Sequence, residues 1–225
     1  ISSVTGFDDF TLRSEGIGDI AVSVAHQHII TESSSVNVSV GLLIPTGAID
    51  KAGDTPRNGV GTLERLPYSM QLGSGTLDVS GLASYSRRVN HFNLGVSTNA
   101  VIRTGYNDNN YRLGNNFSAS ASTRYVKHAK LQPGLKLTYR NVQSIQGRDE
   151  SLLVAAPFEF PASITDPSNY GGTSVNTGFT LKLCQDARCK LSIAAEYDLP
   201  IYQNLNGVQP KTKHALSLAA TWKLD

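Results

Sequence analysis

The end of the chain alternates between apolar and polar side chains. In HALSLAATWKL, residues 214–224, every second position from Leu216 to Leu224 is apolar, and Ser, Ala, Thr and Lys stand between them. A period of two residues is typical of a β-strand with one apolar and one polar face. Such a strand raises the question of whether its apolar face points into a protein core or out into lipid.

The same alternation recurs in segments separated by turn residues. Segments of this kind predict nine strands, at 19–25, 35–45, 76–85, 92–102, 117–125, 131–139, 175–183, 191–199 and 214–224. The segment FDDFTLR (7–13) is a candidate for a tenth strand, and no segment has a convincing helical period. The sequence therefore predicts an all-β fold in the form of an up-and-down antiparallel meander.

The connections between these segments alternate between short and long. The short ones lie near 31–34, 88–91, 127–130 and 184–189. The long ones are rich in Gly, Pro, Asn and Asp and lie at 45–72, 105–113, 147–172 and 203–212. Alternation along a meander places all long loops at one end of the sheet, which is typical of outer-membrane barrels.

The composition favours lipid on the apolar side. Charged residues make up 17% of the chain, against about 25% in ordinary soluble domains. The polar positions are mostly Ser, Thr, Asn, Gly and Ala, which suit a restricted barrel interior, and aromatic residues recur near strand ends. We therefore expect residues 1–225 to form a single transmembrane β-barrel domain of about 10–12 strands in the bacterial outer membrane.

Several loop segments together resemble a known family. They read GIGD (16–19), LLIPTG (42–47), PYSMQLGSGTLD (67–78), YRLGNNFSASASTRY (111–125), YGGTSV (170–175) and LPIYQNLNGVQ (199–209). In this order they resemble bacterial outer-membrane proteins assigned to the meta-pathway of phenol degradation, often called transporters. The resemblance implies an outer-membrane β-barrel of about twelve strands that acts as a channel for small molecules.

Charged residues on the predicted polar faces are candidates for lining the lumen and setting its selectivity. They are Asp78, Arg103, Arg124, Lys136, Arg140, Lys182, Glu196 and Asp198. A ring of charges in a narrow polar channel biases which solutes enter. Alternatively, these groups pair with one another across the lumen and brace a filled interior, as in small barrels.

Two short motifs flank the longest early loop. They consist of Pro45, Thr46 and Gly47 on one side and of Gly73, Ser74 and Gly75 on the other. The loop between them could fold into the mouth of a barrel and narrow it. Alternatively, the motifs are structural, because Pro ends a strand by removing a ladder donor and Gly permits a tight turn.

The remaining chemistry-bearing residues give weaker signals. The pair Cys184 and Cys189 predicts a hairpin disulfide, with free thiols as the alternative. His26 and His28 share a strand face, but no third ligand is near them in sequence, so no metal or other cofactor is expected. The chain has no Gly-x-Ser-x-Gly elbow or other catalytic signature, and we do not expect an enzyme.

These observations predict an outer-membrane channel for the passive passage of small solutes, with hydrophobic or aromatic solutes as candidates. Its expected partners are the lipid bilayer and the solutes. Nucleic acid is not expected, because the net charge is +2 without a basic block. The alternative is a closed structural or partner-binding barrel that acts through its long loops. Loop 147–172 is then the candidate site for a protein partner.

Overall fold

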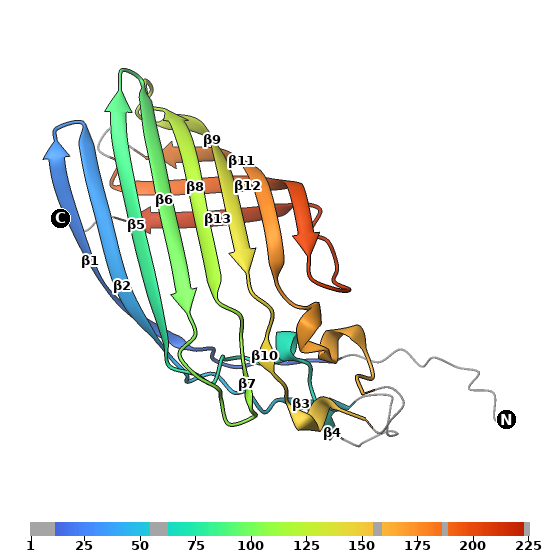
Figure 1. Ribbon diagram of the computed structural model, residues 1–225. Coiled ribbons are helices and arrows are strands. Elements are labelled where there is room, and N and C mark those ends of the chain that lie inside the picture. Colours follow the sequence, from blue (N-terminus) through green and yellow to red (C-terminus); the bar gives the residue numbers. More distant parts are fainter. Residues whose placement is uncertain (1–11, 55–62, 155–158, 186–188, 223–225) are drawn as a thin grey trace.

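Nine long strands form one antiparallel sheet in the computed structural model, which describes residues 12–54, 63–154, 159–185 and 189–222 (Figure 1). These strands are β1 (Ile20–Thr31), β2 (Ser34–Ile44), β5 (Asp78–Val89), β6 (Phe92–Ile102), β8 (Asn116–Tyr125), β9 (Leu131–Val142), β11 (Gly172–Cys184), β12 (Leu191–Leu205) and β13 (Ala215–Trp222). Each strand pairs with the next in this order. The all-β antiparallel meander is thus confirmed, although Lys223 and Leu224 of the last predicted strand lie outside the described residues.

The long loops lie together at one end of the sheet and carry short elements of their own (Figure 1). These elements are β3 (Ala52–Asp54) paired with β4 (Leu63–Arg65), β7 (Tyr111–Arg112) paired with β10 (Gln146–Gly147), and the 3₁₀ turns η1 (Tyr68–Met70), η2 (Glu150–Leu152), η3 (Ser163–Thr165) and η4 (Pro167–Asn169). At the other end the connections are short. Between β5 and β6 the turn is Asn90-His91, and Asn90 has a φ of 53°, a backbone conformation that Asn tolerates well.

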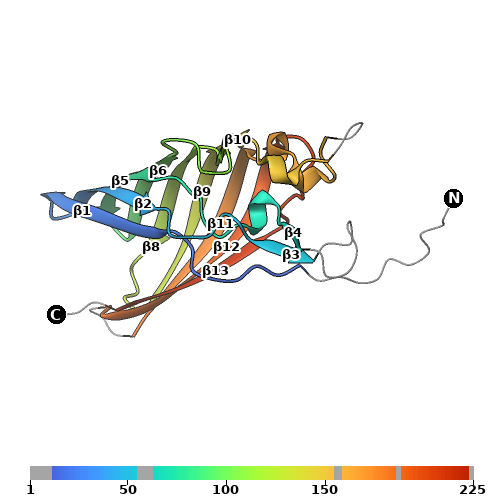
Figure 2. The same ribbon diagram turned by 90° about the horizontal axis from the view of Figure 1, so that it is seen from below.

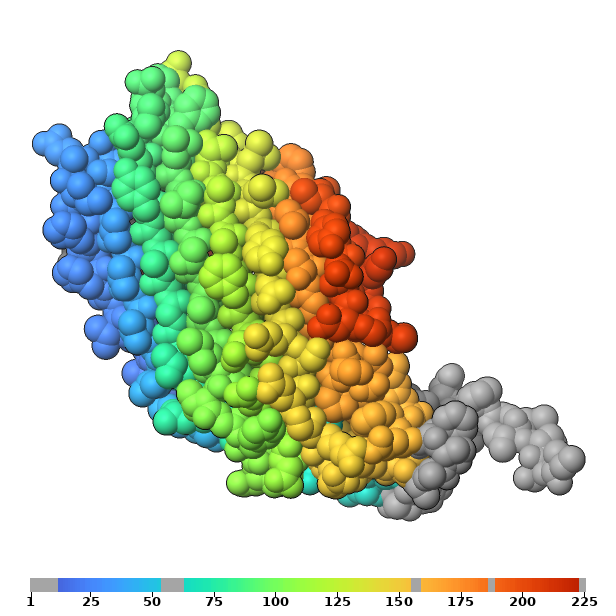
Figure 3. Space-filling model, in the orientation of Figure 1, coloured from blue at the N-terminus to red at the C-terminus, as the bar shows by residue number. Residues whose placement is uncertain are grey.

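The sheet is strongly coiled. β12 and β13 pass behind β5 to β9 in Figure 1 and lie below them in the view of Figure 2. The face that carries Lys136 of β9 and Glu196 of β12 is therefore concave, and these two side chains meet across the intervening strand β11. The opposite face is convex and is turned toward the reader in Figure 3.

The convex face carries the apolar side chains, and these side chains are exposed in the described structure. Val24 is 79% exposed, Leu218 is 73% exposed and Trp222 is 75% exposed, and large apolar side chains on the strands between them are exposed as well. Isolated soluble proteins seldom expose a continuous apolar surface of this size. No helix in the described part of the chain is long and apolar enough to cross a membrane.

The buried apolar cluster lies among the loops rather than under the sheet. Tyr68, Tyr111, Ile145 and Leu152 form it, and Tyr170 packs against it. The ring centroid of Tyr68 lies 4.8 Å from that of Tyr111 and 5.7 Å from that of Tyr170, both in edge-to-face geometry. Three long loops, which are far apart in sequence, therefore share one small core, and we call this region the loop layer.

The expected closure into a barrel of 10–12 strands is not present in the described residues. β1 and β13 form the two edges of the sheet, and neither has a second partner strand there. Eight antiparallel steps separate them, so the two edge strands run in the same direction. The predicted tenth strand at 7–13 lies mostly outside the described residues, and Leu12 and Arg13 are not in a strand.

Two strands are clearly longer than predicted: β1 continues to Thr31 instead of ending at residue 25, and β12 is longer because of a bulge. The pairing of β11 with β12 shifts register between Val175 and Asn176, where Ile201 is the extra residue of β12 beside Pro200. A bulge accommodates a proline that cannot donate to the ladder. β12 therefore continues to Leu205 instead of ending at Leu199.

Candidate functional site

The concave face is the part of the molecule suited to contact small polar solutes. Its side chains are mainly hydroxyl and amide groups, with a few charges. One cavity of about 320 Å³ is lined by residues of β5, β6, β8, β9, β11 and β12. A second, of about 520 Å³, lies between β9, β11, β12 and the segment before β13. Neighbouring strands lie about 4.8 Å apart, so only a curved sheet can enclose such cavities.

An ion pair crosses the middle of this face. Nζ of Lys136 lies 2.7 Å from Oε1 of Glu196, and both side chains are partly exposed to the cavity. Gly178 of β11 stands between their strands, and a Cβ there would lie 2.6 Å from Oδ1 of Asp198 and 3.3 Å from Oε1 of Glu196. The absence of a side chain at Gly178 therefore lets the carboxylates lie over β11 and reach β9.

Two of the predicted lumen residues are cations with few contacts. Nε of Arg140 is 3.4 Å from Oδ1 of Asn116, a weak hydrogen bond, and Arg140 lines the 520 Å³ cavity together with Asp198. Within the described residues the guanidinium group of Arg124 forms no hydrogen bond or ion pair, although it lines the 320 Å³ cavity. Lys182 lies nearer the short turns, opposite Gln132 in the ladder.

Two other candidate lumen residues, Asp78 and Arg103, form an ion pair beneath the loop layer. Asp78 is fully buried, and its Oδ2 lies 2.5 Å from Nη1 of Arg103. Its Oδ1 accepts hydrogen bonds from Oγ1 of Thr76 at 2.7 Å and from the backbone N–H of Thr104 at 3.3 Å. These contacts join the start of β5 to the end of β6, so we assign this pair to holding the sheet and the loops together.

The two glycine motifs meet at a single carboxylate. Oδ1 of Asp19 accepts from the backbone N–H of Gly47 at 3.0 Å, and Oδ2 accepts from that of Ser74 at 2.8 Å. A Cβ at Gly73 would lie 2.4 Å from Asp19 Oδ1 and 2.5 Å from the carbonyl oxygen of Gly47. We call Asp19, Gly47, Gly73 and Ser74 the glycine clamp. It closes the base of the loop between β2 and β5.

The outer residues of the two motifs extend this arrangement. Oγ1 of Thr46 accepts from the backbone N–H of Ile20 and donates to the carbonyl oxygen of Gly18, both at 3.0 Å. Pro45 follows directly after β2 ends, and Gly75 has a φ of 69°, which favours glycine. These contacts hold the two ends of the loop beside β1.

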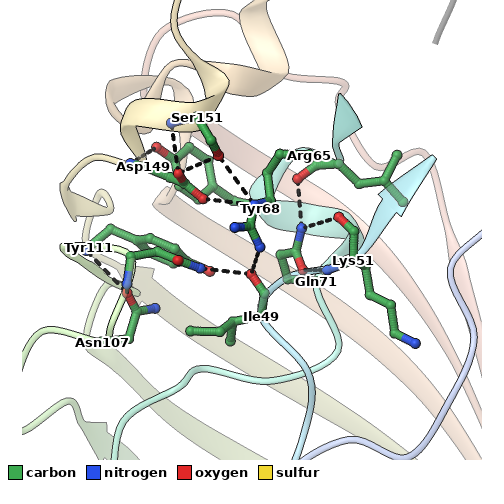
Figure 4. A network of polar contacts seen from close by, with 11 residues as sticks. Ile49, Lys51, Arg65, Tyr68, Gln71, Asn107, Tyr111, Asp149 and Ser151 are labelled. Atoms are coloured by element: carbon green, nitrogen blue, oxygen red, sulfur yellow. Dashed lines mark hydrogen bonds and ion pairs between the residues drawn. The ribbon is translucent and has the colours of Figure 1, made fainter. Parts of the chain in front are cut away.

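A polar network ties the loops to one another (Figure 4). The backbone N–H of Asp149 donates to the Tyr68 hydroxyl at 3.0 Å, and Oδ2 of Asp149 lies 3.4 Å from Nε of Arg65. Nη1 of Arg65 also donates to the carbonyl oxygen of Ile49 at 3.1 Å. Burial raises the pKa of Tyr68 to about 12 and also raises the pKa of Tyr111. Both phenols are therefore neutral at physiological pH, and the Tyr68 hydroxyl accepts the hydrogen bond from Asp149 in this form.

Several residues of the described part of loop 147–172 take part in these contacts. Leu152 belongs to the buried cluster, Tyr170 packs against it, and Asp149 belongs to the polar network. Residues 155–158 of the loop lie outside the described residues. A protein partner at this loop remains a prediction. Such a partner would contact the exposed side of the loop, away from the buried cluster.

The predicted disulfide is confirmed between Cys184 and Cys189. It closes the connection between β11 and β12 at the short-turn end. His26 and His28 stand on the convex face opposite Val38 and Val36. No group of three or more residues able to hold a metal ion occurs within the described ranges.

Two residues of the concave face were not among the candidate lumen residues predicted from the sequence. Arg88 and Asn93 lie in one row of the ladder with Arg124, at the short-turn end. The alternation of Ser84, Ser86 and Arg88 continues the polar face beyond the predicted end of the strand at Tyr85, and that continuation was the available signal. The loop network had no comparable signal, because its members come from separate loops.

No family model matches this chain, and no curated protein matches it either.

Proposed function

We propose that the sheet is part of the wall of an outer-membrane β-barrel and that small solutes pass along its concave polar face. The observation that carries this proposal is the distribution of side chains over the two faces. The convex face exposes a continuous apolar surface, while the concave face holds hydroxyls, amides and charges around cavities. A lipid-facing wall with a wet interior requires this arrangement, whereas a soluble barrel requires the reverse.

Strand length and aromatic placement support the same proposal. Most of the nine strands have 10 to 13 residues, and about 9–11 tilted residues cross a bilayer. At the short-turn end, Phe92 and Tyr125 pack with ring centroids 5.4 Å apart, and exposed Trp222 also ends its strand there. Aromatic residues at this level fit a membrane-interface girdle.

The edges set a condition on closure. Unpaired strand edges are not tolerated in lipid, because their backbone groups find no partner there. Since β1 and β13 run in the same direction, antiparallel closure requires an odd number of further strands. The described sheet has nine strands, so one or three further strands give a total of ten or twelve, which meets this condition, whereas a total of eleven does not. We propose one of these two totals, with the further strands supplied by residues outside the described sheet.

Transport in this proposal is passive, requires no cofactor and contains no catalytic step. Solutes would be small, and selectivity would depend on lumen width and on charge placement. The second candidate function, a closed barrel that acts through its loops, is favoured by one observation. The loop layer has its own buried cluster at one end of the sheet, and such a layer could cover the mouth.

The first test is a measurement of lipid contact, which uses the single tryptophan of the chain, Trp222. The full-length protein is refolded into vesicles whose acyl chains are brominated, and tryptophan emission is compared with that in unbrominated vesicles. We expect strong quenching by the bromines and weak quenching by aqueous iodide. Strong iodide quenching with no effect of bromine would refute a lipid-facing convex side.

The second test is conductance of the same protein in planar bilayers. Discrete, reproducible current steps support an open channel. Protein that inserts, as judged by bromine quenching, and yet carries no current would favour the closed barrel over the channel.

A further inference from the structure

The short-turn end of the concave face carries a row of three polar side chains from neighbouring strands. Arg88 of β5 pairs with Asn93 of β6, and Asn93 pairs with Arg124 of β8. Residues in one row of a ladder project from the same face, so the amide of Asn93 stands between two guanidinium groups. Strand spacing places the two arginine backbones about 10 Å apart.

The row borders two cavities. Arg88 and Asn93 line one of about 420 Å³, together with Lys127 and Gln132. Asn93 and Arg124 line the cavity of about 320 Å³ already described. Asn93 therefore stands where the two cavities meet, and both are in the size range of sites for small molecules.

The two guanidinium groups are not neutralised by the described residues. Neither forms a hydrogen bond or an ion pair there. Glu196 lines the same cavity as Arg124, but its Oε1 is held by Lys136 at 2.7 Å. The cavity beside Arg88 has a lysine and no carboxylate among its lining residues. Two uncompensated like charges on one face are unfavourable for folding, and an anion bound between them would offset that cost.

We propose that Arg88, Asn93 and Arg124 form a binding site for a small organic anion with a carboxylate group, at the short-turn mouth of the channel. The inference specifies which class of solute the proposed channel would carry, and in that respect it rests on the proposed function. A guanidinium group presents a planar fork of donors that matches a carboxylate, and the Asn93 amide adds two further donors. Lys127 extends the positive potential along the route toward the site.

The test measures binding and selectivity on the same refolded full-length protein. Benzoate is titrated by calorimetry, with neutral benzamide and inorganic phosphate as comparison probes, and the reversal potential is measured in a KCl gradient. The variants are Arg88→Gln, Arg124→Gln and the double variant. The matched control is Arg87→Gln, which removes the same charge from the adjacent residue, whose side chain is on the opposite face.

We expect benzoate to bind the wild type and benzamide not to bind. Each single variant should weaken benzoate binding by about tenfold or more, since a hydrogen bond to a charged group contributes that much. The double variant should lose benzoate binding and have a weaker preference for chloride, because Arg140 remains on the same face, and Arg87→Gln should keep both. Arg124→Lys keeps the charge but lacks the planar fork of donors, so it should weaken benzoate binding and retain the preference for chloride.

The outcomes separate the site from the channel. Absent benzoate binding, or equal binding by the double variant and the control, overturns the site even if current steps are present. Phosphate binding without benzoate binding overturns the carboxylate assignment. Benzoate binding that depends on both arginines, in a protein that inserts but carries no current, supports the site and overturns the channel.

Discussion

Replacing the buried carboxylate of Asp78 by an amide should be the most destabilising conservative change in the sheet. Asp78→Asn keeps the shape of the side chain but removes the negative charge that Arg103 contacts at 2.5 Å. Asp78 is fully buried and Arg103 is 16% exposed, so the cation cannot recover full hydration. Removing one partner of a buried pair costs about 3–5 kcal/mol, and we expect a loss of this size in the free energy of unfolding.

A double-mutant cycle isolates the pair from its surroundings. Arg103→Gln alone should also be strongly destabilising, because it leaves the Asp78 carboxylate with only Thr76 and Thr104 as donors. The double variant should lose less than the sum of the two, by about 2 kcal/mol, as expected for residues in direct contact. The control is Arg148→Gln, which breaks exposed, solvent-screened ion pairs and should leave the free energy of unfolding nearly unchanged.

The assay is urea unfolding of the refolded protein in detergent micelles, followed by far-ultraviolet circular dichroism and by Trp222 emission. The single tryptophan lies in β13, far along the sheet order from β5, so coincident transitions would report loss of the whole sheet. A loss below 1 kcal/mol for Asp78→Asn, or single-variant losses that simply add, would refute the assignment of this pair to structure. Arg103 and Asp78 would then be available for selectivity after all.

Three further predictions follow from the loops and the short turns. Gly73→Ala places a Cβ 2.4 Å from a carboxylate oxygen and should lower the unfolding midpoint clearly, whereas Gly81→Ala, which meets nothing within 4 Å, should leave it nearly unchanged. Reduction of Cys184–Cys189 should cost at most about 2 kcal/mol, since the loop is short, and should be measurable as a drop in Tm against a Cys→Ser double variant that no longer responds to reductant. The pKa of Tyr68 is raised by burial to about 12, so its contribution to stability is present below pH 10 and is lost as the pH rises toward 12. The wild type should lose about 2–3 kcal/mol more than Tyr68→Phe over that interval in urea titrations, and equal losses would contradict the cause.

The strands could be predicted from the sequence because their information is local. The alternation from Val36 to Ile44, for example, requires only that one face be apolar and the other polar, and the structure places β2 there. The contacts of the loop layer could not be predicted in this way. Tyr68 and Asp149 are 81 residues apart in sequence, and no period links them. Side chains that meet through the packing of separate loops leave no pattern within either loop.

The charged residues illustrate the same limit at the candidate site. Their alternation assigns each to the polar face, but it does not say which of them are paired. Arg103 pairs with Asp78, which is 25 residues away in sequence, and Lys136 pairs with Glu196, which is 60 residues away. In each case the register of the strands brings the two side chains together. Each of these cations is offset by its own carboxylate and adds little net charge to the lumen. Arg88, Arg124 and Arg140 have no such partner among the described residues. If the sheet lines a channel, its preference for anions should therefore depend on those three residues.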